Sequence, residues 1–197
     1  MKSSSEPARG AGVPPRVRAD AARNRDRLIE VARAAFLAGA DRVSLEGIAR
    51  DAGVGVGTLY RHFPTREALV EAVYRSELAE VCGTADGLLA EHGPADALRR
   101  WMDNYAAFVV TKRGMAETLR SVLQSGTIPA GETRQRVTET VAMLLAAGVA
   151  TGDFRPDVQP GDVVVSMVGI FLASPELGDG EQVRRMLDLL DAGVRAR

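Results

Sequence analysis

Apolar residues recur every three to four positions along most of this chain, which is the spacing of a helix that buries one of its faces. No stretch shows sustained alternation of β-branched residues at a period of two, the pattern that a half-buried strand would need. We also find no internal repeat. The sequence therefore predicts an all-α fold.

Capping residues and helix breakers divide this pattern into separate predicted helices. Ser44 and Thr65 can each cap a helix N-terminus, and Pro94 suits the first turn of a helix. Gly39 and Gly53 can end helices in a left-handed conformation. The predicted helices span about residues 24–38, 45–52, 56–63, 66–81, 94–109, 115–123, 132–150, 161–173 and 180–194.

Composition bounds the class of protein. Hydrophobic residues make up 46% of the chain and charged residues 26%, which is ordinary for a chain with a packed core. The single cysteine, Cys82, can form no disulfide within the chain, which favours a reducing compartment. The longest apolar run, Val163–Ala173, is shorter than the ~20 residues of a membrane helix, and Met1–Asp20 lacks the apolar segment of a signal peptide. We therefore expect a soluble cytoplasmic protein with no membrane partner.

Charge is distributed unevenly along the chain. Residues 1–75 hold thirteen Lys and Arg against nine Asp and Glu, whereas the remaining residues hold twelve against seventeen. A basic N-terminal third joined to an acidic remainder suits a nucleic-acid module attached to a part that stays away from a polyanion. We expect a disordered basic tail at 1–19, a three-helix helix-turn-helix domain at 20–75, and a larger helical-bundle domain at 76–197.

The strongest local feature is a pair of short helices joined by a turn at Val54. Gly53 permits the positive φ of such a turn, and Ala49 is small enough for the two helices to approach closely. The second helix then presents an outer surface that fits a major groove. An ordinary helix pair with a solvated outer face has the same spacing, so spacing alone leaves both interpretations open. The outer surface consists of Gly57, Thr58, Arg61 and His62, with Tyr60 at its rim.

The run from Ala49 to Phe63, ARDAGVGVGTLYRHF, is followed by Arg66, Leu69 and Val73. These residues resemble the N-terminal domain of TetR-type transcriptional regulators over about residues 22–75. The resemblance implies a homodimer that binds double-stranded operator DNA through its N-terminal helices. It also implies release by a small-molecule effector held in the C-terminal domain, so that domain would bind the effector and dimerise. We expect neither an enzyme nor a bound cofactor.

Farther along the chain the resemblance continues at shorter motifs. Trp101, the run Lys112–Met115 and the run Phe154–Asp157 are similar to one actinobacterial-type subgroup of the C-terminal domain.

The resemblance assigns roles to particular side chains near the turn. Tyr60 matches a family position that usually contacts phosphate, and His62 matches one that often reaches a phosphate or a base. Ser44 stands where the second helix approaches phosphate, which the helix dipole favours. Arg66 matches a basic phosphate contact at the start of the fourth helix. The candidate DNA-binding residues are Ser44, Gly55, Val56, Gly57, Thr58, Tyr60, Arg61, His62 and Arg66.

Two positions depart from the family pattern. Gly55 stands where a Ser or Thr cap is usual, and Val56 stands where a polar or basic side chain often reads bases. Base readout would then rest mainly on Thr58 and Arg61. The departures also motivate an alternative function, that of a helical small-molecule-binding protein whose DNA-binding face is vestigial.

The aromatic stripe of the fifth predicted helix has two interpretations. Trp101, Tyr105 and Phe108 recur at helical spacing, which more often marks a core than a ligand site. The resemblance, however, implies an effector pocket among these helices, and such pockets are mostly apolar with a few polar groups. The candidate pocket residues are Trp101, Tyr105, Met115, Leu119 and Met143.

The last two predicted helices carry more apolar surface than a small domain buries alone. Pairing them with the same helices of a second copy would bury that surface in a four-helix interface, although burial within one chain is the alternative. The residues concerned are Val164, Val165, Val168, Ile170, Phe171, Leu172, Val183, Met186, Leu187 and Leu190.

Other sites are not predicted. His62 and His92 lie in separate elements without metal-ligand spacing, so we expect no metal site. The glycines at 53, 55 and 57 lack the preceding strand and the G-x-G-x-x-G spacing of a dinucleotide fingerprint. Cys82 is expected to be a plain buried thiol.

Overall fold

A computed structural model describes residues 15–38, 44–129, 131–173 and 180–196 of the chain. Within these residues every named element of secondary structure is an α-helix, which confirms the predicted all-α fold. The helices are α1 (Pro15–Leu37), α2 (Leu45–Asp51), α3 (Val56–His62), α4 (Arg66–Glu91), α5 (Pro94–Gly114), α6 (Ala116–Gln124), α7 (Glu132–Thr151), α8 (Pro160–Ala173) and α9 (Gly180–Val194).

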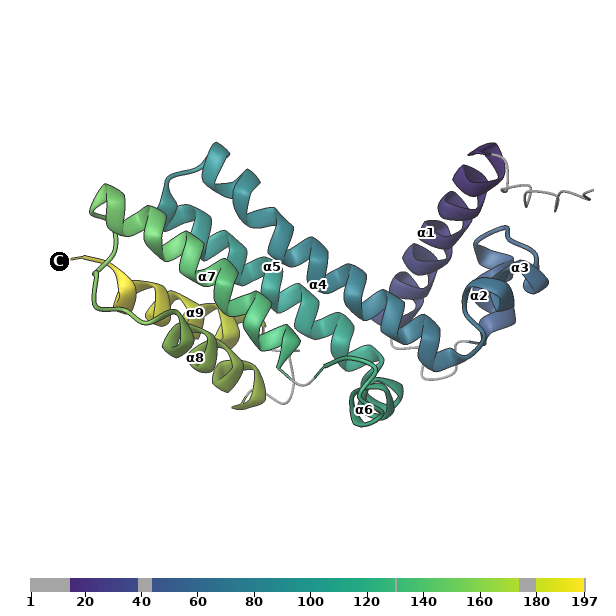
Figure 1. Ribbon diagram of the computed structural model, residues 1–197. Coiled ribbons are helices and arrows are strands. Elements are labelled where there is room, and N and C mark those ends of the chain that lie inside the picture. The colour runs from purple at the N-terminus through teal and green to yellow at the C-terminus, as the bar shows by residue number, and fades with distance from the viewer. Residues whose placement is uncertain (1–14, 39–43, 130, 174–179, 197) are drawn as a thin grey trace, which may run out of the picture.

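The helices form two groups that one long helix connects (Figure 1). Helices α1, α2 and α3 lie at one end of the molecule, and α5, α7, α8 and α9 pack together at the other (Figure 1). Helix α4 has 26 residues and packs against α1, α5, α6 and α7. The expected division between residues 75 and 76 therefore falls inside a continuous helix that both groups share.

The local signals for helix ends are confirmed where the structure describes them. Ser44 Oγ accepts a hydrogen bond from the Gly47 amide at 3.0 Å, and Thr65 Oγ1 accepts one from the Ala68 amide at 3.2 Å. Pro94 begins α5, and Gly53 adopts a φ of 65° after α2. Gly39 lies outside the described residues.

The beginning of α1 corrects the predicted extent of the N-terminal tail. The helix starts at Pro15, so residues 15–19 are helical and do not belong to a disordered segment. Proline is tolerated in the first turn of a helix, and the residues after it are mostly Ala and Arg, which are strong helix formers. They carry no apolar stripe, so a search for periodicity passes over them. Residues 1–14 of the predicted tail lie outside the described residues.

One hydrophobic core extends through both groups of helices, from Leu28 on α1 to Val194 on α9. Trp101 is completely buried within it, and its Nε1 donates a hydrogen bond to the Val81 carbonyl oxygen at 2.8 Å. An ion pair between Arg99 and Asp188 at 2.7 Å joins α5 to α9. In the described part of the chain, no helix is both long and apolar enough to cross a bilayer.

The end of α7 depends on a close contact between Gly148 and Phe154. The chain reverses at Gly152, which has a φ of 82°, and the Phe154 amide donates a hydrogen bond to the Gly148 carbonyl oxygen at 3.1 Å. The Phe154 ring is buried against Gly148 so closely that a Cβ at residue 148 would overlap it. Only glycine leaves room for the ring at this position.

We predict that Gly148→Ala lowers the free energy of unfolding by about 1–3 kcal/mol, because the added methyl group displaces a buried aromatic ring. Chemical denaturation followed by circular dichroism measures the effect. Gly87→Ala on α4 is the matched control, since its Cβ meets nothing within 4 Å. It is expected to stabilise the helix by roughly 0.5–1 kcal/mol. An unchanged free energy for Gly148→Ala would show that the ring can move without cost.

Candidate nucleic-acid interface and effector cavity

The turn between α2 and α3 sets the direction of α3. The positive φ of Gly53 lets its amide bond back to the Arg50 carbonyl oxygen at 3.0 Å, and the Val54 amide bonds to the Ala49 carbonyl oxygen at 2.9 Å. Ile48 and Leu59 are then buried in the core that α2 and α3 share with α1. With its inner face fixed in this way, α3 has a defined outer face.

Most of the predicted DNA-binding residues lie on this outer surface. Gly55, Val56, Gly57, Tyr60 and Arg61 are exposed, and Thr58 and His62 are partly buried. Ser44 is also exposed, at the N-terminus of α2. Helix α3 contains no acidic residue, so its own charged side chains are basic.

The two departures from the family pattern have structural counterparts. Gly55 is the N-cap residue of α3 and provides no side-chain hydrogen bond. Val56 begins the helix with 43% of its surface exposed. The first turn of α3 therefore presents backbone and an apolar side chain where a polar side chain is usual.

Arg66 lies differently from the other predicted contacts. Its Nε donates a hydrogen bond to Thr118 Oγ1 of α6 at 3.2 Å, and its guanidinium lies 5.7 Å from the centre of the Phe36 ring on α1. The side chain is half-buried. Arg66 therefore joins the start of α4 to two other helices, whatever contact it makes with DNA.

Tyr60 has a partner that the sequence did not indicate. Its hydroxyl donates a hydrogen bond to Glu46 Oε1 on α2 at 2.7 Å. This bond lowers the pKa of the Glu46 carboxyl and raises the pKa of the Tyr60 hydroxyl above its ordinary value. Nothing local in the sequence links two residues fourteen positions apart.

This hydrogen bond gives a direct prediction for Glu46→Gln. Removing the carboxylate removes the charged acceptor that favours the neutral phenol, so the pKa of Tyr60 should fall toward its ordinary value. NMR of the tyrosine ring carbons during an alkaline titration measures the shift, while circular dichroism confirms the fold. Tyr74 and Tyr105, whose pKa values burial raises, serve as internal controls that should not move. An unchanged Tyr60 pKa would contradict the bond.

Two neighbouring cavities lie beside α5 in the C-terminal group. The α6 cavity, of about 480 Å³, is bounded by α5, α6 and α8. The α7 cavity, of about 640 Å³, is bounded by α4, α5, α6, α7, α8 and the segment before α7. Both volumes fall within the usual range for small-molecule sites. The residues common to the two cavities are Tyr105, Lys112, Leu123, Val168 and Leu172.

The predicted pocket residues are not all brought together. Tyr105 lines both cavities and Leu119 lines the α6 cavity. Trp101 is in the core, one turn before Tyr105, and Met115 is also buried; neither lines these cavities. Met143 is exposed on α7 and lines neither cavity. Which side of α5 faces a cavity depends on how α6, α7 and α8 pack, and the stripe alone does not determine this.

Lys112 is the main lining residue that the pocket prediction omitted. It follows Tyr105, Phe108 and Val109 at helical spacing, so it continues the apolar stripe of α5 with a charged residue. A lysine on an otherwise apolar face is a signal of a polar site, and it could have been found from the sequence.

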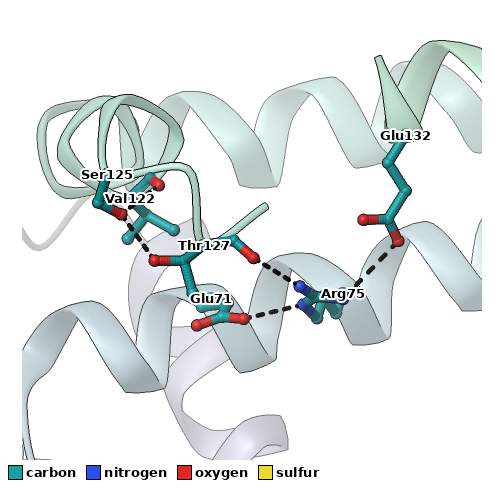
Figure 2. Close-up of polar contacts among 6 residues, drawn as sticks. All are labelled: Glu71, Arg75, Val122, Ser125, Thr127 and Glu132. Carbon is teal, nitrogen blue, oxygen red and sulfur yellow. Dashed lines mark hydrogen bonds and ion pairs between the residues drawn. The ribbon is translucent and has the colours of Figure 1, made fainter. Parts of the chain in front are cut away.

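Hydrogen bonds connect the border of the α7 cavity to α4 (Figure 2). Arg75 on α4 donates to the Thr127 carbonyl oxygen at 3.0 Å and lies 3.7 Å from Glu132 at the start of α7. Glu71 accepts a second bond from Arg75, at 3.0 Å. One residue earlier, the hydroxyls of Tyr74 and Thr133 are 2.5 Å apart. The segment between α6 and α7 is thereby attached to the helix that leads to α1, α2 and α3.

An all-α chain with a helix-turn-helix unit at one end and largely apolar cavities at the other has the architecture of a ligand-responsive DNA-binding regulator. Residues 28–73 match the bacterial regulatory proteins of the tetR family. Residues 93–196, just over half of the chain, match the C-terminal domain of SbtR-like transcriptional regulators. The chain belongs to the TetR family of transcriptional regulators.

Solved structures and a curated relative agree with this assignment. A TetR transcriptional regulator from Streptomyces coelicolor is 44% identical, with a TM-score of 0.78 over 87% of this chain and 98% of that one. A TetR regulator from Mycobacterium vanbaalenii is 33% identical, with a TM-score of 0.73 over 91% and 99% of the two chains. An HTH-type transcriptional regulator from Staphylococcus aureus is 40% identical over 63 residues, which are 32% of this chain and 34% of that relative. The chain thus matches about a third of the length of its curated relatives.

Proposed function

We propose that this chain represses transcription as a homodimer bound to operator DNA, and that a small molecule in the cavities beside α5 releases it. The observation that carries the proposal is a pair of attachments at the α7 cavity: Arg75 bonds to the segment before α7, and Tyr74 bonds to Thr133 in the first turn of α7. Both residues lie on α4, which follows α3 in the chain after a short connecting segment. A ligand that displaces the segment therefore acts on the helix that supports the DNA-binding unit.

At the DNA face, the proposed roles follow from exposure and chemistry. Thr58 and Arg61 are proposed to contact base edges, where a hydroxyl or a guanidinium can discriminate between base pairs. Exposed Val56 offers methyl groups of the kind that contact a thymine methyl. Gly55 and Gly57 have no side chain that would keep the helix backbone away from DNA. At Gly57 the space beside the Cα is open, since a Cβ there would meet nothing within 4 Å.

Tyr60, His62 and Ser44 are proposed to contact phosphates, which fix the position of a protein on DNA without reading its sequence. For Tyr60 this requires an exchange of partners, because its hydroxyl donates to Glu46 in the absence of DNA. The exchange is feasible because the pair is exposed, and exposed polar pairs contribute little net free energy.

The proposed dimer interface uses exposed apolar residues of α8 and α9. Val164, Ile170, Phe171, Val183 and Leu187 are buried within the chain, so burial in one protomer accounts for about half of the predicted set. Of the rest of that set, Leu172 on α8 is 77% exposed. Leu189 on α9, which the sequence prediction did not include, is 73% exposed. Large apolar side chains so exposed on adjacent helices support a second copy as their partner.

For the DNA face, we predict that Tyr60→Phe weakens binding to operator DNA and to scrambled DNA alike. The loss of binding free energy is at most about 1 kcal/mol, because the variant removes one phosphate hydrogen bond. Thr58→Ala should lower discrimination at one or two symmetric operator positions more than it lowers total affinity. Mobility shifts at fixed salt, with DNA from upstream of the coding region, measure both effects.

Arg100→Ala, which changes an exposed residue of α5 far from α3, is the control for these shifts and should bind as the parent does. If both variants bind operator as the parent does, α3 is not the recognition helix. If the parent shifts no upstream fragment specifically, the chain is instead a small-molecule-binding protein with a vestigial DNA-binding face. The uncapped and apolar first turn of α3 is the feature that favours this second candidate.

For the dimer, we predict that Leu189→Glu converts the protein to a monomer, since a charge cannot be buried unpaired between two protomers. Operator affinity should fall with it, because a monomer occupies only one half-site. Sedimentation velocity and mobility shifts measure the two effects. Val110→Glu on α5 changes another exposed apolar residue to glutamate and should leave the dimer intact. A dimeric Leu189→Glu protein would place the interface elsewhere.

A further inference from the structure

The charged residues that line the two cavities are all basic. Lys112 lines both cavities, Arg113 and Arg120 line the α6 cavity, and Arg134 lines the α7 cavity. Among the described residues, no Asp or Glu lines either one. The remaining lining side chains are mostly apolar, such as Val168 and Leu172. The charge of the site therefore has a single sign, in an apolar setting.

Lys112 differs from the other three cations because it lies where the two cavities meet. It is partly buried, and burial lowers the pKa of its ammonium group. Across residues 15–38, 44–129, 131–173 and 180–196, its ammonium group makes no ion pair or hydrogen bond. Arg113, by contrast, already donates to the Phe171 carbonyl oxygen at 2.5 Å. An ammonium in apolar surroundings without a protein counter-ion is suited to an anion from outside the chain.

Tyr105 adds a second donor on the same face of α5. It precedes Lys112 by seven residues, which is two turns of a helix, and it lines both cavities. Its ring contacts Trp101, Phe108 and Phe171, whereas its hydroxyl has no hydrogen-bond partner among the described residues. Burial raises the pKa of this hydroxyl to about 12, so it remains a proton donor at neutral pH.

We propose that the effector is a small amphiphilic carboxylate whose head group binds Lys112 and Tyr105 and whose apolar body lies along Val168 and Leu172. This inference deepens the proposed function, on whose effector site it rests. A carboxylate carries one negative charge, which one ammonium offsets, and its two oxygens can accept bonds from two donors. A phosphate dianion would bring a second charge into the same apolar space, which is costly to bury.

Calorimetric titration of the full-length protein with sodium octanoate, octanamide and octylammonium tests the proposal. The three probes share a chain of eight carbons and differ in the charge of the head group. We expect octanoate to bind at least about tenfold more tightly than octanamide, a difference of about 1.4 kcal/mol, and octylammonium to bind most weakly. Lys112→Met should abolish the preference for octanoate while keeping the affinity for octanamide, and Lys112→Arg should restore it.

Arg100→Met is the matched control, because it removes a cation from the same helix at an exposed position that lines neither cavity. It should keep the preference for octanoate. Circular dichroism of each variant confirms that the fold is intact.

Four outcomes would overturn the proposal. Equal affinities for octanoate and octanamide would make the cavities purely apolar sites. A preference for octanoate that survives in Lys112→Met would assign the carboxylate to another cation. Failure of all three probes to bind would exclude amphiphiles of this kind. Octanoate binding that weakens as the protein dimerises would show that the second copy, and not an effector, occupies the cavities.

The titrations contain no DNA, so their result does not depend on operator binding. If octanoate binds through Lys112 but leaves the operator complex intact, the proposed release fails and the ligand assignment stands. If another compound releases operator equally well from Lys112→Met, the ligand assignment fails and the proposed function stands.

Discussion

The relation between the two ends of this molecule depends on α4 being one uninterrupted helix. Its buried residues extend from Leu69 to Ala85, and it packs against α1, α5, α6 and α7. Bending such a helix would break backbone hydrogen bonds inside a packed core, and each unpaired polar group there costs about 1–3 kcal/mol. A displacement at one end of α4 is therefore transmitted along the helix more readily than it is absorbed within it.

Close contacts also hold α1 against α4 and α5. Gly114 at the end of α5 lies so near the Phe36 carbonyl of α1 that a Cβ there would overlap it. Arg33 on α1 lies 3.3 Å from Glu77 on α4, whose pKa burial raises while the guanidinium opposes that rise. The DNA-binding unit is thus fixed by packing on several sides. A ligand can move it only if the ligand binds better to a second arrangement of these contacts.

The sequence predicted those parts of the fold that local chemistry determines. The caps at Ser44 and Thr65, the proline that opens α5 and the left-handed Gly53 each depend on a few neighbouring residues, and the structure confirms all four. The start of α1 was missed because a helix can form from strong helix formers without an apolar stripe.

The site was less predictable because it depends on residues far apart in the chain. The sequence predicted an outer surface of α3 around Gly57 and Arg61, and both residues are exposed. The bond between Tyr60 and Glu46, and the cavity position of Lys112, depend on how separate helices meet. A helical stripe identifies residues that are buried on folding, but it does not determine whether they contact other side chains or line a cavity. Trp101 packs in the core, whereas Tyr105 lines a cavity.

The polar groups of the two proposed binding surfaces differ in whether they have a partner within the protein. The difference follows from how many contacts each ligand makes. On the DNA face the Tyr60 hydroxyl is held by an exposed carboxylate, a bond worth little in water. A DNA duplex offers many phosphates at once, so losing one such bond reduces affinity only slightly. A small effector has few contacts, and every protein bond it must break subtracts from its affinity. Lys112, which has no charged partner among the described residues, need not break a protein bond to bind an effector. The free protein instead bears the cost of a partly desolvated charge.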